Sequence, residues 1–185
     1  MASETARIRY ARKHEEVELR KAFNMIDFKC DNLIDAEELE QLFIMMDHRP
    51  EKIKDVVKDV IWEADEDCDG ANTYEEFTRM YQRCQNDKSG QEPQQLYHIT
   101  LFLMNQQDKK VSMESALQLM YLMHGKQDLD EHLREIFGTS DLNSDVSLNL
   151  TGFLKAFHTA QVKKLNNRVT SKTYKAPPPP TKKHR

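Results

Sequence analysis

The stretch that decides the fold runs from Asp65 to Glu76 and reads Asp-Glu-Asp-Cys-Asp-Gly-Ala-Asn-Thr-Tyr-Glu-Glu. It places carboxylates at its first, third, fifth and twelfth positions, which are Asp65, Asp67, Asp69 and Glu76. A calcium ion takes about 6 to 8 hard oxygen ligands, and a bidentate Glu at position twelve closes that shell. Gly70, at position six, permits the sharp turn that such a loop requires. The stretch, here called loop two, predicts a calcium-binding loop; a solvated acidic loop is the alternative.

The same spacing recurs upstream in residues 27–38, here called loop one. Carboxylates fall at positions one, five, nine and twelve, which are Asp27, Asp31, Asp35 and Glu38. Lys29 stands at position three, where a ligand oxygen is required. We hypothesise that its ammonium lies among Asp27, Asp31 and Glu38 and neutralises them, because opposite charges about 4 Å apart attract strongly. Loop one is then a salt-bridged pseudo-site, with a weaker metal site as the alternative.

Two further loops at similar spacing have lost most of these ligands. Loop three, near residues 104–115, holds one carboxylate at a ligand position, Asp108, and ends on Ser115. Loop four, near residues 141–152, keeps Asp141, Asn143 and Asp145 but has Gly152 at position twelve. Neither loop has the bidentate Glu, so we expect no binding in the sensor range of about 10⁻⁷ to 10⁻⁵ M. The C-terminal half is therefore predicted to be kept for its shape.

Apolar residues at helical spacing flank each loop, which predicts an all-α fold. We expect two lobes, each a pair of helix–loop–helix units, with an extended N-terminal helix and a basic proline-rich tail. The predicted boundaries are residues 1–84 for the first lobe, 85–93 for a polar linker, 94–164 for the second lobe and 165–185 for the tail.

Four loops in two pairs resemble the calmodulin-like four-EF-hand family, over roughly residues 15–164. Carried over position by position, the resemblance implies one calcium-ligand set at Asp65, Asp67, Asp69, the Ala71 carbonyl, Thr73 (through water) and Glu76. It implies a weaker second set at Asp27, Asp31, the Leu33 carbonyl, Asp35 and Glu38. It also implies a short strand contact between positions eight of paired loops, which are Ile34 and Asn72. The polar Asn72 departs from the family pattern, and we expect it to weaken that contact.

A looser likeness joins the chain to four-EF-hand proteins of cilia and flagella. It rests on the stretches Ile61-Trp62-Glu63-Ala64-Asp65-Glu66-Asp67 and Tyr81-Gln82-Arg83-Cys84. The likeness implies a cytoplasmic, cytoskeletal location in the axoneme of a cilium or flagellum. Tubulin or dynein-associated proteins are the partners that follow from it.

Charge is divided unevenly along the chain. Residues 163–185 carry eight Lys and Arg and no Asp or Glu, whereas residues 1–162 carry 19 basic and 31 acidic side chains. The acidic body suits basic partner helices, and the tail suits an acidic surface. Pro177, Pro180 and Lys182 also fit a ligand of SH3-type domains, while a solvated tail is the alternative. No apolar run approaches the ~20 residues of a transmembrane helix.

The motifs favour binding over catalysis. The chain has no Gly-rich phosphate loop and no His-Glu-x-x-His motif, so we expect no enzyme. Methionine-lined grooves accept partner helices, and Met45, Met46 and Met80, or Met104, Met120 and Met123, are candidates; ordinary core residues are the alternative. The sequence therefore predicts a calcium-responsive regulatory or structural subunit, attached constantly to a larger assembly through an amphipathic helix of another subunit. A diffusible calcium sensor that binds target helices only when loaded is the alternative.

Overall fold

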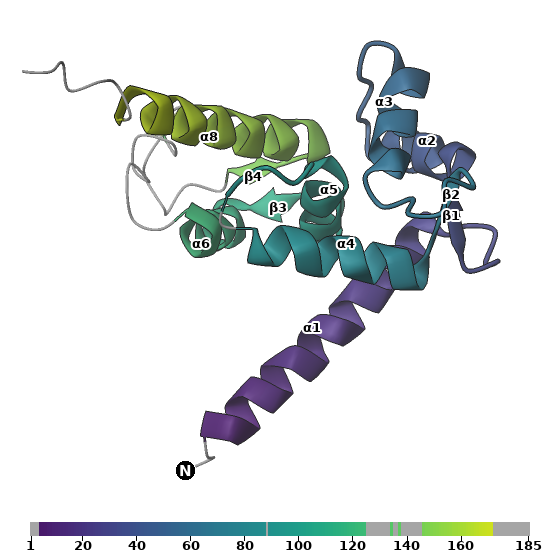
Figure 1. The fold of residues 1–185 in the computed structure, drawn as a ribbon, viewed down its shortest axis with the longest axis horizontal. Coiled ribbons are helices and arrows are strands. Elements are labelled where there is room, and N and C mark those ends of the chain that lie inside the picture. The colour runs from purple at the N-terminus through teal and green to yellow at the C-terminus, as the bar shows by residue number, and fades with distance from the viewer. Residues whose placement is uncertain (1–3, 88, 125–133, 135–136, 138–145, 172–185) are drawn as a thin grey trace, which may run out of the picture.

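The computed structural model describes residues 4–87, 89–124 and 146–171, together with residues 134 and 137. In that part of the chain it contains seven helices and only small strands, so the predicted all-α fold is confirmed (Figure 1). In chain order the elements are α1 (Glu4–Ile26), β1 (Leu33–Asp35), α2 (Ala36–Met45), α3 (Ile53–Trp62), β2 (Ala71–Thr73), α4 (Tyr74–Asn86), α5 (Gln95–Asn105), β3 (Val111–Ser112), α6 (Met113–His124), β4 (Ser147–Leu148) and α8 (Leu150–Ser171).

Two short antiparallel ladders join the loops in pairs. Strand β1 of loop one pairs with β2 of loop two, and Ile34 lies opposite Asn72. Strand β3 pairs with β4, and Val111 lies opposite Leu148. Each of these four residues occupies position eight of its loop. The spacing of the loops along the sequence therefore gives the correct register of both ladders.

The outgoing helices of loops one and two begin with the same capping device. Asp35 caps α2 by accepting the N–H of Glu38, whose own side chain accepts the Asp35 N–H. Thr73 and Glu76 form the same reciprocal pair at the start of α4. Such a capping box satisfies two of the N–H groups that a helix start leaves without partners. Positions nine and twelve of each loop therefore also start a helix.

Aromatic side chains form the core of each half. Phe23 of α1 makes an edge contact with Phe77 of α4, with ring centroids 5.4 Å apart. In the C-terminal half, Phe153 of α8 lies 5.4 Å from Phe102 and 4.5 Å from Phe157. The buried residues of both halves belong to one continuous apolar cluster. The two predicted lobes are thus packed together along their helices.

Three of the methionines assigned to partner grooves are core residues. Met46, Met80 and Met120 are all buried, as the alternative of ordinary core residues expects. The reason is their helical spacing, which places them on the same faces as the aromatic core. Met45 is exposed and Met104 is partly buried; the side chain of Met123 lies outside the described part.

The two terminal helices are long. Helix α1 has 23 residues and its first half extends away from the rest of the molecule (Figure 1), which confirms the extended N-terminal helix. Helix α8 continues to Ser171, past the boundary predicted at residue 164. No Gly or Pro occurs between Phe153 and Ala176, so nothing in that stretch stops the helix. No helix in the described residues is both long and apolar enough to span a bilayer.

Several predicted features lie outside the described residues. They are Asp141, Asn143 and Asp145 of loop four and the tail residues Pro177, Pro180 and Lys182.

Candidate metal centre

Loop two is folded around its first carboxylate. Asp65 Oδ1 accepts the N–H of Asp69 at 3.1 Å, and its Oδ2 accepts the N–H of Gly70 at 3.0 Å. Asp67 Oδ1 also accepts the Asp69 N–H, at 3.3 Å, and Asp69 Oδ1 accepts that of Ala71 at 2.9 Å. Gly70 has φ +90°, a conformation that costs glycine little and other residues more. Backbone donors thus hold the acidic side chains in place.

Glu76 closes the loop from the other end. Its Oε1 accepts the N–H of Glu66 at 3.1 Å, and its Oε2 accepts the Thr73 N–H at 2.8 Å and the Thr73 hydroxyl at 2.7 Å. The side chain is almost fully buried. Burial by itself would raise the pKa of Glu76, but the hydrogen bonds from Thr73, Glu66 and Asp67 outweigh it, so the pKa is lowered. The carboxylate is therefore ionised and pre-positioned.

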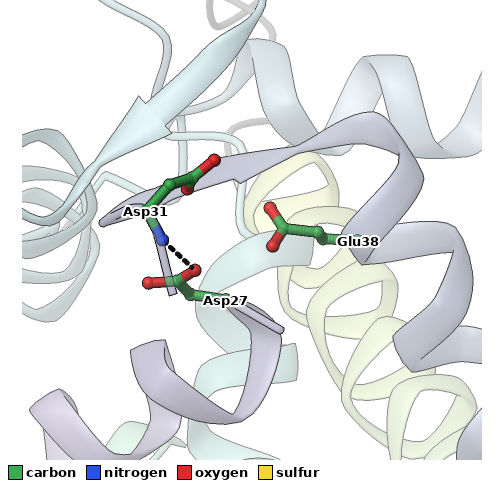
Figure 2. A group of neighbouring side chains, drawn as sticks. All are labelled: Asp27, Asp31 and Glu38. Carbon is green, nitrogen blue, oxygen red and sulfur yellow. Dashed lines mark hydrogen bonds between the residues drawn. The ribbon is translucent and has the colours of Figure 1, made fainter. Parts of the chain in front are cut away.

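Loop one repeats this pattern of hydrogen bonds. Asp27 accepts the N–H groups of Asp31 and Asn32, both at 3.1 Å. Glu38 accepts those of Lys29 at 2.9 Å and Asp35 at 3.1 Å. Three of the four donors stand at the same positions as in loop two, namely five, six and nine, whereas the fourth stands at position three in loop one and at position two in loop two. Figure 2 shows the carboxylates of Asp27, Asp31 and Glu38 facing a common space.

The partners predicted for Lys29 are wrong. Its ammonium bonds to Asp35 at 2.5 Å and to Glu37 at 3.0 Å, outside the group formed by Asp27, Asp31 and Glu38. Asp27 and Glu38 are both buried, and moving an ammonium between them would cost it its hydration. The bonds to Asp35 and Glu37 raise the pKa of Lys29. Lys29 therefore leaves the acidic group open and occupies Asp35, the ligand expected at position nine.

Each loop brings three carboxylates together. Oxygens of Asp65, Asp67 and Glu76 all lie within 4.8 Å of one another, as do those of Asp27, Asp31 and Glu38. Two of the expected carboxylate ligands, Asp69 in loop two and Asp35 in loop one, are not members of these groups. Among the described residues, these are the acidic groups with the geometry to hold a metal ion. Their residues fit Ca²⁺, since its ligands are carboxylate and carbonyl oxygens.

Loop three closes without such a group. Gln107 and Lys110 exchange both backbone hydrogen bonds, at 2.7 and 3.0 Å. Asp108 and Lys109 between them both have positive φ, as in a tight type I′ hairpin turn. The following helix starts on hydroxyl groups, because Ser112 Oγ accepts the N–H of Ser115. Backbone and serine contacts thus do what the carboxylates do in loop two.

Helix α8, which follows loop four, also starts without a carboxylate. Asn149 Oδ1 accepts the N–H of Gly152 at 2.9 Å. A Cβ at residue 152 would lie 3.1 Å from Leu148, so the position favours glycine sterically.

The polar residue at position eight of loop two is fully buried. Asn72 has 0% exposure, and neither its side-chain oxygen nor its nitrogen has a hydrogen-bond partner. A buried amide without partners costs about 1–3 kcal/mol in protein mutational data. The ladder between the loops therefore carries a destabilising residue at its centre.

Sequence reasoning missed the arginines that brace loop two from outside. The Glu66 carboxylate lies 3.0 Å from Arg79 and 3.0 Å from Arg83. The two arginines are four residues apart and so lie on one face of α4. That spacing, together with an acid at loop position two, is the signal that was available.

A family model of the EF-hand domain pair matches residues 16–82. That range contains α1 from residue 16, both acidic loops, their ladder and most of α4. Residues 16–82 are thus an EF-hand domain pair, consistent with a calmodulin-like EF-hand protein. This domain pair indicates calcium binding and attachment to protein partners. No curated protein matches the chain.

Proposed function

We propose that the chain is a calcium-binding regulatory subunit whose principal site is loop two. The observation that carries this proposal is the group formed by Asp65, Asp67 and Glu76, with oxygens within 4.8 Å in an EF-hand domain pair. Asp69 stands in the same loop outside that group, so loop two carries four carboxylates at ligand positions, and their mutual repulsion favours a divalent cation. When bound, Ca²⁺ neutralises these charges and fixes the two ends of the loop relative to each other.

Loop one is the weaker site in this proposal. It offers three carboxylates, Lys29 supplies no oxygen at position three, and Asp35 is engaged by the Lys29 ammonium. Loop three supports no site, because its backbone closes as a tight turn. The asymmetry between the halves supports a division of labour, in which the N-terminal half responds to calcium and the C-terminal half contributes a fixed shape.

We further propose that the protein stays attached to a larger cytoskeletal assembly, such as an axoneme, whether or not calcium is present. The support is the C-terminal half, whose loop three and α8 start are stabilised by contacts that need no ion. The alternative, a diffusible sensor, requires that calcium first expose a groove for a target helix. Co-sedimentation with the assembly in excess EGTA separates the two, because release by EGTA would exclude constant attachment.

The calcium site is tested by calorimetric titration of the purified chain. We expect one site in the micromolar range, lost in Glu76→Gln and retained in Glu75→Gln. Glu75→Gln is the matched control, because it removes the same charge from the neighbouring residue, whose side chain is exposed. Heat that persists in Glu76→Gln and disappears in Glu38→Gln would assign the principal site to loop one instead. No binding below the millimolar range in the unmodified chain would overturn the proposal.

A further inference from the structure

Helix α5 is the element that joins the two halves. All eight residues from Leu96 to Leu103 are buried, which means that no side of this helix faces water. It packs against α1, α3 and α4 of the N-terminal half and against α8 of its own half (Figure 1). Tyr97 lies 5.3 Å from Tyr81 of α4, ring centre to ring centre. A helix buried in this way depends on both halves for its position.

The start of α5 is capped by a side chain of the other half. Glu63, at the end of α3, accepts the N–H of Leu96 at 2.8 Å and that of Gln95 at 3.2 Å. Gln94, which precedes the helix, provides no side-chain cap of its own. The first N–H groups of a helix need acceptors, and a carboxylate is the strongest one available. Glu63 is buried and stands two residues before Asp65, the first residue of loop two.

A second set of contacts links loop two to the segment that leads into α5. Arg83 donates to Glu66 of loop two at 3.0 Å, to the Glu63 carbonyl at 3.0 Å and to Glu92 at 3.3 Å. Asp87 holds the turn before Glu92 by accepting the N–H groups of Gly90 at 2.9 Å and Glu92 at 3.0 Å. Arg83 thus links the connection between the halves to loop two, and Asp87 holds the turn within that connection.

We propose that Glu63 couples the metal site of loop two to the docking of helix α5 on the N-terminal half. An ion at Asp65 fixes the end of α3, and the Glu63 carboxylate then meets the α5 start with less loss of conformational freedom. The coupling is reciprocal: the factor by which the ion favours docking of α5 equals the factor by which docked α5 raises the affinity for the ion. This inference rests on the proposed calcium site of loop two. Glu63 acts here as a positioning residue, not as a ligand.

The thiol of Cys84 reports whether α5 is docked. It is 5% exposed and donates to the Pro93 carbonyl at 3.3 Å, directly before α5. Cys30 and Cys68 are exposed, so the background Cys30→Ser/Cys68→Ser leaves one protected thiol. The rate at which a thiol reagent modifies Cys84 then measures how often α5 separates from the N-terminal half. In this background we expect calcium to slow the modification by about fivefold or more, the lower end of typical coupling between sites.

Two changes at Glu63 separate its reach from its charge. Glu63→Gln removes the charge, whereas Glu63→Asp keeps the charge and draws the carboxylate back from α5. We expect both to speed Cys84 modification without calcium, to bring the ratio of rates with and without calcium close to one, and to weaken calcium binding about fivefold. Glu75→Gln, which removes the charge of an exposed side chain at position eleven of loop two, should leave that ratio as it was.

The outcomes distinguish the inference from the function on which it rests. If the unmodified chain binds no calcium, the proposed function fails. The rates of Cys84 modification without calcium then still test the Glu63–α5 contact. If the chain binds calcium but calcium leaves the Cys84 rate unchanged, the inference fails even where a Glu63 variant does not fold. Both Glu63 variants could instead speed Cys84 modification while the ratio of rates with and without calcium stays unchanged. That result would show that Glu63 only stabilises the α5 contact, and it would also overturn the coupling.

Discussion

Replacing Asn72 by valine should stabilise this protein. Asn72 lies opposite Ile34 at the centre of the ladder between loops one and two. Its side chain is fully buried, and both polar atoms lack a partner. Valine has a similar size, no polar atom and a preference for strands. The change therefore removes a cost from the folded state without removing any hydrogen bond.

The expected gain follows from the burial. Relieving the desolvation of one unpaired amide contributes about 1–3 kcal/mol to the free energy of unfolding. The strand preference of valine adds less than about 1 kcal/mol, and this contribution overlaps with the gain from burial, so the two are not summed. We expect a net gain of about 1–3 kcal/mol.

Urea denaturation in EGTA measures this gain. The far-ultraviolet circular dichroism at 222 nm follows the helices, and the fluorescence of Trp62, the single tryptophan, follows the end of α3. Asn24→Val is the matched control, because Asn24 is exposed on α1 and such surface changes stay within about 0.5 kcal/mol. Asn72→Leu is measured beside it, so that one side-chain shape does not decide the outcome. If neither replacement stabilises the chain, the amide of Asn72 has partners such as a buried water, and the reasoning is refuted.

Three further changes test individual parts of the site. Lys29→Asp supplies an oxygen at position three and frees Asp35, so calorimetry should show one additional calcium site; an unchanged stoichiometry would contradict the salt-bridge explanation of loop one. Gly70→Ala should cost about 1 kcal/mol in urea denaturation because φ is +90°, although no atom lies within 4 Å of the added Cβ. Burial raises the pKa of Glu63 from 4.5 to about 7, against hydrogen bonds from α5 that lower it. The folded chain then keeps a proton that the unfolded chain loses, so stability in EGTA should fall from about pH 4.5 to pH 7. Glu63→Gln should lack that slope, and parallel curves would exclude Glu63 as its source.

Local sequence rules predicted the loops well, because each loop depends on neighbours within twelve positions. Position eight gave Ile34 and Asn72 as partners, and the ladder has that register. Position twelve gave Glu38 and Glu76, and both side chains accept backbone N–H groups from the start of their loops. Here the expected ligands at positions nine and twelve also form the helix caps, so one short pattern bears on two structural features at once. Whether these residues bind calcium stays a prediction.

The contacts between the halves could not be predicted in the same way. Glu63 and Leu96 are far apart in the sequence, and no spacing rule relates them. A signal was nonetheless present, since Glu63 stands three residues after the buried Val60 and next to the buried Ala64. An acid on an apolar helix face needs a partner, and the start of α5 provides it. For Lys29, the error came from counting charges in the loop without considering the hydration of the ammonium.

The position of α5 bears on how calcium can act in this chain. A sensor of the diffusible kind exposes an apolar groove when it binds the ion. Here the helix that follows the EF-hand pair already packs against α1, α3 and α4, and it is capped by Glu63 from the N-terminal half. An ion at loop two would therefore stiffen an existing contact before it could open a new one. This argument favours a subunit whose attachment is adjusted by calcium over one that is recruited by it.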